Sequence, residues 1–175
     1  MAQFFAIHPD NPQDRLIKQA ADIVRSGGVI VYPTDSCYAL GCKLGDKNAM
    51  ERILTIRKID QKHHLTLMCA DLSELGTYAK VDNAQFRQLK AATPGSYTFI
   101  LQATKEVPNR TLHPKRKTIG LRVPNNATAL ALLQELGEPI LSCTLMLPED
   151  DEPLTDPYEI RDCLEHAVDL VIDGG

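Results

Sequence analysis

The chain has 175 residues, a length that supports one well-buried core and is short for two ordinary domains. Apolar residues make up 43% and charged residues 24%, and the longest apolar runs, 28–32 and 139–143, fall far short of a membrane span, which argues against a disordered or membrane-spanning chain. The net charge of −4 combines a basic part, 1–148 with a net charge of +5, and an acidic part, 149–175, so an anionic partner is not excluded.

The beginning of the chain alternates between strand and helix patterns. Residues 3–8 are predicted to form a strand. Asn11 is predicted to cap a helix that has Pro12 at its first position and ends at residues 27–28, because its apolar residues recur at helical spacing. The β-branched run 29–32 is typical of a fully buried strand.

The alternation continues to the end of the chain. A short strand at 37–42 precedes a helix from Lys47 to about Arg57 that Asp46 can cap. The further predicted elements are strand 65–70, helix 83–92, strands 97–101 and 118–123, helix 127–136 capped by Asn126 and closed by Gly137, strand 140–145, a short helix at 157–165 and strand 168–172. Such alternation predicts an α/β fold with an open, at least partly parallel sheet and helices packed on it. We find no repeat or domain boundary, so residues 1–175 are expected to form one domain.

The cysteines and histidines predict no metal site. The five cysteines are scattered without a C-x-x-C pair and are expected to be small buried hydrophobes in a reducing compartment. They are Cys37, Cys42, Cys69, Cys143 and Cys163. The histidines are equally dispersed apart from His63 and His64. The N-terminus has no basic region followed by an apolar stretch, so we expect no secretory signal and a cytoplasmic protein.

The segment 32-YPTDSCYALG-41 directly follows a predicted buried strand. Pro33 fixes one backbone angle, and Thr34, Asp35 and Ser36 offer short hydrogen-bonding side chains, a combination typical of a turn. A turn that only ends the strand is one interpretation. Ligands of open α/β sheets bind near strand ends, so a binding site is the other. The further loops to consider on that ground lie at 57–64, at 113–118 and after 140–145.

Four segments, taken in order, resemble signature blocks of the YrdC/YciO family. The segment 32–41 is close to the family's YPTDTVYGLG. The blocks 94-PGSYTFIL-101, 119-IGLRVPNN-126 and 139-PILSCTLM-146 are similar to the family's PGPxTxIL, VAVRxPxH and PLxSTSAN. The resemblance covers about residues 15–148 and is nearest to the YciO branch of the family.

This resemblance implies a YrdC-like open, twisted, mixed sheet with a positively charged concave cleft. The family activity that it implies is the synthesis of threonylcarbamoyl-adenylate from threonine, bicarbonate and ATP, with Mg²⁺ accompanying the ATP, for the modification of tRNA. Members have also been linked to double-stranded RNA binding. The family continues after Gly175 with a further strand and a tail, which this sequence does not contain.

The resemblance also implies ligand contacts at particular residues. It places Thr34 at the amino-acid substrate, Thr118 near the nucleotide, and Arg122 where the family clamps a carboxylate. A guanidinium fork suits a carboxylate or phosphate. Ser142 falls at another substrate-lining position, and Thr144 keeps a hydroxyl in the same block. The alternatives are that Thr34 hydrogen-bonds only its own turn and that Arg122 points to solvent.

Two segments depart from the family's ATP-binding pattern. The family's K-x-R becomes Arg57-Lys58-Ile59, so Arg57 replaces the lysine, Ile59 replaces the arginine, and Lys58 is displaced by one position. Met146 stands at the asparagine of S-A-N and lacks the amide donors. Losing one preorganised donor typically costs about 3 kcal/mol, or about 10²–10³ in rate. We therefore expect synthase activity to be weak or lost.

Basic residues form two clusters that suit phosphates. Lys115, Arg116 and Lys117 lie in one of them, between Arg110 and Arg122, where no acidic residue occurs. The second cluster comprises Arg57, Lys58, Lys62, His63 and His64. If both flank one cleft, they predict salt-dependent contacts with RNA phosphates, for which Lys58 and residues 115–117 are the candidates. Ordinary solvated loops are the alternative interpretation.

The first hypothesis is a nucleotide- or double-stranded-RNA-binding protein related to tRNA threonylcarbamoyladenosine biosynthesis, with no tightly bound cofactor or metal. The alternative is an ATP-dependent threonylcarbamoyl-adenylate synthase that binds ATP with Mg²⁺ and threonine. A third hypothesis is an interaction module that uses the acidic stretch 149–175 as its contact surface.

Overall fold

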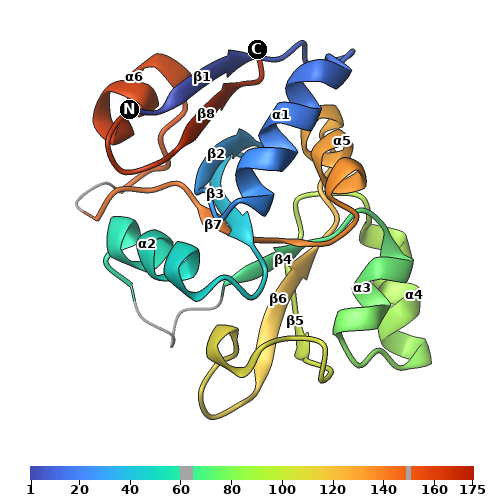
Figure 1. Ribbon diagram of the computed structural model, residues 1–175. Helices are drawn as coiled ribbons and strands as arrows, with labels where there is room; N and C mark the ends of the chain where they lie inside the picture. Colours follow the sequence, from blue (N-terminus) through green and yellow to red (C-terminus); the bar gives the residue numbers. More distant parts are fainter. Residues whose placement is uncertain (60–64, 149–150) are drawn as a thin grey trace.

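A computed structural model describes residues 1–59, 65–148 and 151–175. Its strands form one eight-stranded mixed sheet in the order β1-β8-β2-β3-β7-β4-β6-β5 (Figure 1). The strands are β1 (Gln3–Ala6), β2 (Ile30–Pro33), β3 (Tyr38–Lys43), β4 (Thr66–Met68), β5 (Phe99–Gln102), β6 (Thr118–Arg122), β7 (Ile140–Thr144) and β8 (Leu170–Asp173). The helices are α1 (Asp14–Arg25), α2 (Lys47–Arg57), α3 (Leu72–Tyr78), α4 (Asn83–Ala92), α5 (Ala127–Leu136), α6 (Pro157–Leu164) and the short 3₁₀ helix η1 (Asn109–Thr111). The predicted α/β class and mixed sheet are confirmed.

Strand directions bring several loops to one end of the sheet. β3 is antiparallel to both β2 and β7, β7 is antiparallel to β4, and β4 is parallel to β6. The carboxyl ends of β2 and β7 therefore lie at the same end as the amino ends of β3, β4 and β6. We call this the turn end of the sheet, because the turn between β2 and β3, residues 34–37, lies there.

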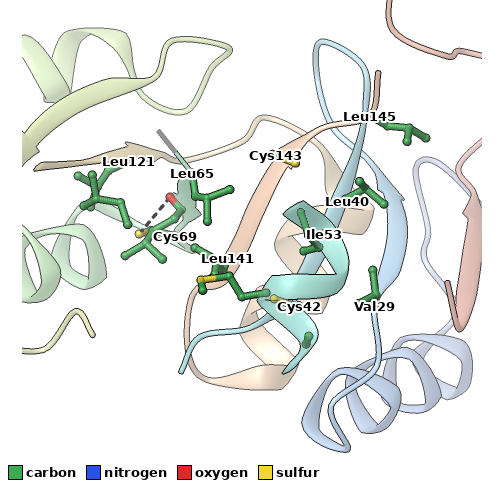
Figure 2. Close-up of a cluster of buried hydrophobic side chains, with 14 of the residues drawn as sticks. Val29, Leu40, Cys42, Ile53, Leu65, Cys69, Leu121, Leu141, Cys143 and Leu145 are labelled. Carbon is green, nitrogen blue, oxygen red and sulfur yellow. Dashed lines mark hydrogen bonds between the residues drawn. The ribbon is translucent and has the colours of Figure 1, made fainter. Parts of the chain in front are cut away.

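Helices cover both faces of the sheet, and each covered face has its own apolar core (Figure 1). Strand alternation sends Ile30 and Ile140 to the face under α1 and α5. Leu40 and Leu141 point to the opposite face, where Ile53 of α2 packs against them (Figure 2). The helices α3, α4 and α6 also contribute buried side chains to this second face, namely Leu75, Leu89 and Ile160. Burying one such side chain stabilises the fold by roughly 1.5–3 kcal/mol.

The local helix signals are correct for two helices and wrong for one. Asp46 and Asn126 accept from the backbone N–H groups of Ala49 and Ala129 and so cap α2 and α5 as predicted. The predicted Asn11 cap is wrong, because α1 begins at Asp14. The imidazole of His8 accepts from the backbone N–H groups of Asp10 and Asn11, at 3.1 and 3.0 Å, and holds this stretch as a turn.

Two elements were not predicted, and some bounds differ. The structure adds α3 and η1, and β4 is shorter than the predicted strand 65–70. The signal for α3 is present in the sequence, because Asp71 and Glu74 have the spacing of a capping box. The Asp71 carboxylate accepts from the Glu74 backbone at 2.8 Å, and the Glu74 carboxylate accepts from Ala70 at 2.9 Å.

The cysteines are reduced, and three of the five are buried as predicted: Cys42, Cys69 and Cys143. Burial is the main reason that the pKa of the Cys42 thiol rises to about 12, so this thiol stays protonated and packs as a small hydrophobe. Cys163 is exposed and Cys37 is half-buried, so the prediction fails for these two. Among the described residues, no helix has the length and apolarity needed to cross a bilayer.

Candidate functional site

The turn between β2 and β3 is held together by the Thr34 side chain. Its hydroxyl accepts from the backbone N–H groups of Ser36 and Cys37, both at 3.2 Å, and donates to the carbonyl of Cys37. The Thr34 carbonyl accepts from the side-chain amide of Asn126, at the start of α5, at 3.4 Å. The interpretation that Thr34 hydrogen-bonds its own turn is therefore correct, while a ligand contact stays a prediction.

Arg122 lies at the end of β6 and is enclosed rather than solvent-facing. Its Nη2 donates to the carboxylate of Asp35 in the turn, and its Nε donates to the carbonyl of Gly95 at 3.1 Å. The Arg122 side chain is 8% exposed and the Asp35 side chain 14% exposed. A buried guanidinium needs such a partner, because an unpaired charge in the interior is strongly unfavourable.

Ser142 lies beneath the surface in the middle of β7. Its hydroxyl is 2.7 Å from the phenol oxygen of Tyr32 and donates to the Leu40 carbonyl at 2.8 Å, so the Tyr32 phenol is the donor to Ser142. Both side chains are fully buried, and burial raises the pKa of the Tyr32 phenol well above its usual value. Contrary to the expectation of a substrate-lining residue, Ser142 is inaccessible in this conformation and braces β2 against β3 and β7.

Four candidate residues share one face of the sheet. The neighbours Ile119 and Leu121 point to the core under α2, α3, α4 and α6, so Thr118 and Arg122 point to the face under α1 and α5. By the same alternation Ser142 and Thr144 of β7 point to that face, since Cys143 points to the other.

Arg57 reaches the sheet from the opposite side. It is the last residue of α2, and its Nη1 donates to the backbone carbonyl of Thr144 at 2.7 Å. Lys58 follows in a left-handed conformation, φ 52°, and its side chain is exposed. The structure therefore joins Arg57 to the carboxyl end of β7, at the turn end of the sheet.

The basic loop, residues 113–117, precedes β6 at the same end. The imidazole Nδ1 of His113 accepts from the backbone N–H groups of Lys115 and Arg116 at 3.3 and 3.2 Å, and Lys117 is left-handed with φ 56°. These contacts hold a tight turn that leaves the side chains of Lys115, Arg116 and Lys117 exposed. None of the ion pairs found among residues 1–59, 65–148 and 151–175 involves these three cations.

Thr34, Arg57, Thr118 and Thr144 share the turn end of the sheet, whereas Arg122 ends β6 at the opposite end, Ser142 lies in the middle of β7, and the six candidates do not share one pocket. A hollow of about 230 Å³ lies beside the turn, and its lining includes Thr34, Ser36, Cys37 and Asn126. Of the six candidate substrate residues, Thr34 alone is among the described residues that line it. Lys62, His63 and His64, which belong to the second basic cluster, lie outside the described residues.

Nothing in the described part of the chain forms a resident metal centre. In that part, no group of three or more His, Cys, Asp or Glu side chains is placed to hold an ion. If Mg²⁺ takes part in a reaction, it would arrive with the phosphates of ATP as part of the substrate.

Sequence reasoning named Asp35 only as a turn residue and missed its role as the partner of Arg122. It also missed a pair of carboxylates, Glu74 on α3 and Glu138 before β7. Within the described structure, Glu138 Oε1 is a buried oxygen without a hydrogen-bond partner. The pKa of the Glu74 carboxyl is raised, chiefly by burial and further by the charges of Asp71 and Glu138. The capping-box spacing of Asp71 and Glu74 was the available signal for part of this cluster.

This carboxylate pair predicts how stability depends on pH. Because the folded state binds the Glu74 proton more tightly than the unfolded state does, stability should fall as pH rises above 4.5, the ordinary pKa of this group. The variant Glu138→Gln removes the neighbouring charge and supplies an amide donor, so it should flatten this decline and stabilise the protein at pH 7 by about 1 kcal/mol. Urea unfolding between pH 4 and 8 measures both effects, with the exposed Glu51→Gln as the control. A decline that is equally steep in both variants would contradict the prediction.

Comparisons with known proteins place this arrangement in a family. The family model of Sua5, YciO and YrdC, described as "Telomere recombination", matches residues 22–175. The protein YciO of Escherichia coli strain K12 is 66% identical over 175 residues, covering 100% of this chain and 85% of that protein. A threonylcarbamoyl-AMP synthase of Chromobacterium violaceum is 36% identical over 135 residues, covering 77% of this chain and 69% of the synthase.

Solved structures agree on the fold. The crystal structure of E. coli YciO matches with a TM-score of 0.97 at 66% identity, covering 100% of this chain and 85% of that one. P. abyssi Sua5 complexed with L-threonine matches with a TM-score of 0.88 at 24% identity, covering 98% of this chain and 50% of that one. The chain therefore belongs to the Sua5/YciO/YrdC family, whose more distant members include threonylcarbamoyl-AMP synthases.

Proposed function

We propose that this chain binds the phosphates of a nucleotide or of double-stranded or transfer RNA at the turn end of its sheet, and that its synthesis of threonylcarbamoyl-adenylate is weak or lost. The observation that carries the proposal is the position of the basic loop. The exposed cations Lys115, Arg116 and Lys117 directly precede Thr118 of β6, at the same end as Arg57, Lys58 and the 34–37 turn. Clustered exposed cations attract phosphates with little regard to sequence.

Weak synthase activity is supported by the surroundings of Ile59 and Arg57. Ile59 packs partly buried against the core and brings no charge to the end of α2. Arg57 already donates to the Thr144 carbonyl, so part of its guanidinium is used to brace β7. Met146, half-buried after β7, offers no amide donor. The set of donors available to an ATP phosphate is therefore smaller than the family's blocks imply.

Binding of tRNA and of a short RNA duplex at several salt concentrations tests the proposal. Removing three phosphate contacts with Lys115→Gln/Arg116→Gln/Lys117→Gln should weaken binding uniformly across RNA sequences. It should also lower the slope of log affinity against log salt by about 2–3. Fluorescence anisotropy with labelled RNA gives both quantities.

A matched control removes the same charge elsewhere. Arg15, Lys18 and Lys90 are exposed residues on α1 and α4. Replacing all three with Gln should leave the salt slope unchanged if the basic loop makes the contacts. Equal weakening by both triple variants would mean that only net charge matters. An RNA affinity that does not change with salt concentration, or no RNA binding at low salt, would contradict the proposal.

Threonylcarbamoyl-adenylate synthesis is the second candidate function. It is favoured by the 36% identity to the Chromobacterium violaceum threonylcarbamoyl-AMP synthase. Incubation with threonine, bicarbonate, Mg²⁺ and ATP, followed by measurement of pyrophosphate, tests it directly. Release well above background that requires threonine would favour this function over a binding role.

A further inference from the structure

The guanidinium of Arg122 is already occupied by groups of the protein itself. Its Nη2 donates to Asp35 and its Nε donates to Gly95, and the side chain is only 8% exposed. An external carboxylate or phosphate would need N–H groups of this same planar fork. Because the side chain is also almost fully enclosed, Arg122 is not accessible to ligands in this conformation, and Asp35 is the charged group that holds it.

The segment that carries Asp35 is built as a self-contained unit. Within the turn, the Thr34 hydroxyl bonds to the backbone of Ser36 and Cys37, so residues 34–37 are braced by their own hydrogen bonds. Outside β2 and β3, the side-chain bonds found for the turn among described residues run to Arg122 and, at 3.4 Å, to Asn126. If Asp35 is released from Arg122, the 3.4 Å hydrogen bond between the Asn126 side-chain amide and the Thr34 carbonyl is the one of these two that remains.

There is also space beside the turn. The hollow of about 230 Å³ is lined by Thr34, Ser36 and Cys37, but Asp35 and Arg122 are not among the lining residues. The space thus borders the turn on a flank that the Asp35 side chain does not occupy. The hollow therefore offers space next to the turn for a displacement that separates Asp35 from Arg122.

We propose that Asp35 acts as a latch on Arg122. A ligand that carries a carboxylate or phosphate group binds Arg122 only after the 34–37 turn has released Asp35, and the ligand anion then takes the place of the Asp35 carboxylate. The apparent affinity is the intrinsic affinity multiplied by the fraction of molecules with the latch open, so a small open fraction weakens binding, and neutral ligands do not stabilise the open state. The choice of ligand rests on the proposed function, whereas the latch itself does not.

Chemical labelling of Arg122 tests the latch without any ligand. Asp35→Asn keeps the shape of the side chain and removes its charge, so it should raise the open population and the rate of phenylglyoxal modification of Arg122 by about tenfold. Mass spectrometry of the labelled peptides gives the rate for each arginine. Arg52, which pairs with Asp169 at 2.8 Å, should keep its rate and serves as the internal reference.

A matched variant and an exchange measurement separate the latch from general loosening. Asp22→Asn breaks the surface pair with Arg25 and should leave the labelling of Arg122 unchanged. Hydrogen exchange at the β6 amides of Ile119 and Leu121 should be the same in Asp35→Asn as in the native protein. An unchanged Arg122 rate in Asp35→Asn overturns the proposal, as does a rise matched by faster exchange along β6.

Calorimetry with L-threonine and with inorganic phosphate tests the ligand step. Asp35→Asn should bind the anion that uses Arg122 about tenfold more tightly than the native chain does. In the native chain, that anion should speed exchange at the amides of Ser36 and Cys37. If Asp35→Asn binds threonine alone more tightly, the ligand of Arg122 is a carboxylate. If it binds inorganic phosphate alone more tightly, the ligand is a phosphate. If a probe binds the native chain and binds Asp35→Asn no more tightly, the latch is overturned. Faster labelling with no binding of either probe to either protein leaves the latch standing and contradicts threonine and phosphate as its ligands, while the proposed function is tested separately by the RNA measurements.

Discussion

The double variant Ile59→Arg/Met146→Asn is expected to raise pyrophosphate release from ATP, threonine and bicarbonate by at least about 10²–10³ over the native chain, the effect of one restored donor. Each substitution returns a donor that the family's blocks have and this chain lacks. The arginine would extend from the end of α2, beside Arg57, and the asparagine from the segment after β7. Donors held in place before the reaction stabilise developing charge more strongly than solvent does.

A control variant places the same groups at neighbouring positions. Ile56 and Leu147 are partly buried residues that pack against the same core as Ile59. Ile56→Arg/Leu147→Asn should therefore disturb the packing of this core to a similar extent but leave pyrophosphate release at the native level. No gain from the first double variant, with its fold intact, would contradict the assignment of Ile59 and Met146 as the missing donors.

The second large effect concerns stability. Arg122→Met should destabilise the fold by roughly 3–5 kcal/mol, because it leaves the nearly buried carboxylate of Asp35 without its partner. Asp35→Ala should also be strongly destabilising, since it leaves the enclosed Arg122 guanidinium without its carboxylate partner. The double variant should lose less than the sum of the two, with a coupling of about 1–3 kcal/mol. Urea unfolding of the native chain, the two single variants and the double variant gives the coupling free energy between Arg122 and Asp35.

The surface pair of Arg25 and Asp22 supplies the comparison. These residues also form an ion pair, at 3.0 Å, but their side chains are 42% and 73% exposed. Arg25→Met and Asp22→Ala should each change stability by no more than about 0.5–1 kcal/mol, because exposed pairs are screened by water. Strictly additive losses at Arg122 and Asp35 would show that the two side chains do not act as a pair.

The parts of the fold that could be predicted are those with local causes. The capping side chains of Asp46 and Asn126 accept from backbone N–H groups three residues away, so these helix starts can be recognised in the sequence. The apolar run 29–32 likewise became part of a buried central strand. Where a local signal met a competing local contact, as at His8 and Asn11, the helix start was misplaced.

The candidate site was predictable as a set of segments but not as a geometry. The family blocks indicated Thr34, Arg122, Ser142 and Thr144, and side-chain alternation along β6 and β7 places the last three on one face. The sequence did not indicate that Ser142 would be covered by Tyr32, 110 positions away in the chain. Nor did it indicate that Arg57 would donate to Thr144, 87 positions away.

Taken alone, the sequence determined the α/β class, the alternation of strands and helices, the family resemblance and the basic character of the loop before β6. These properties follow from composition, spacing and contacts within a few residues. Only the tertiary structure decided that Asp35 closes Arg122, 87 positions along the chain, because this pair forms where the turn after β2 meets β6. Strand order depends on many long-range pairings at once, and no local pattern encodes which two charges will be buried together.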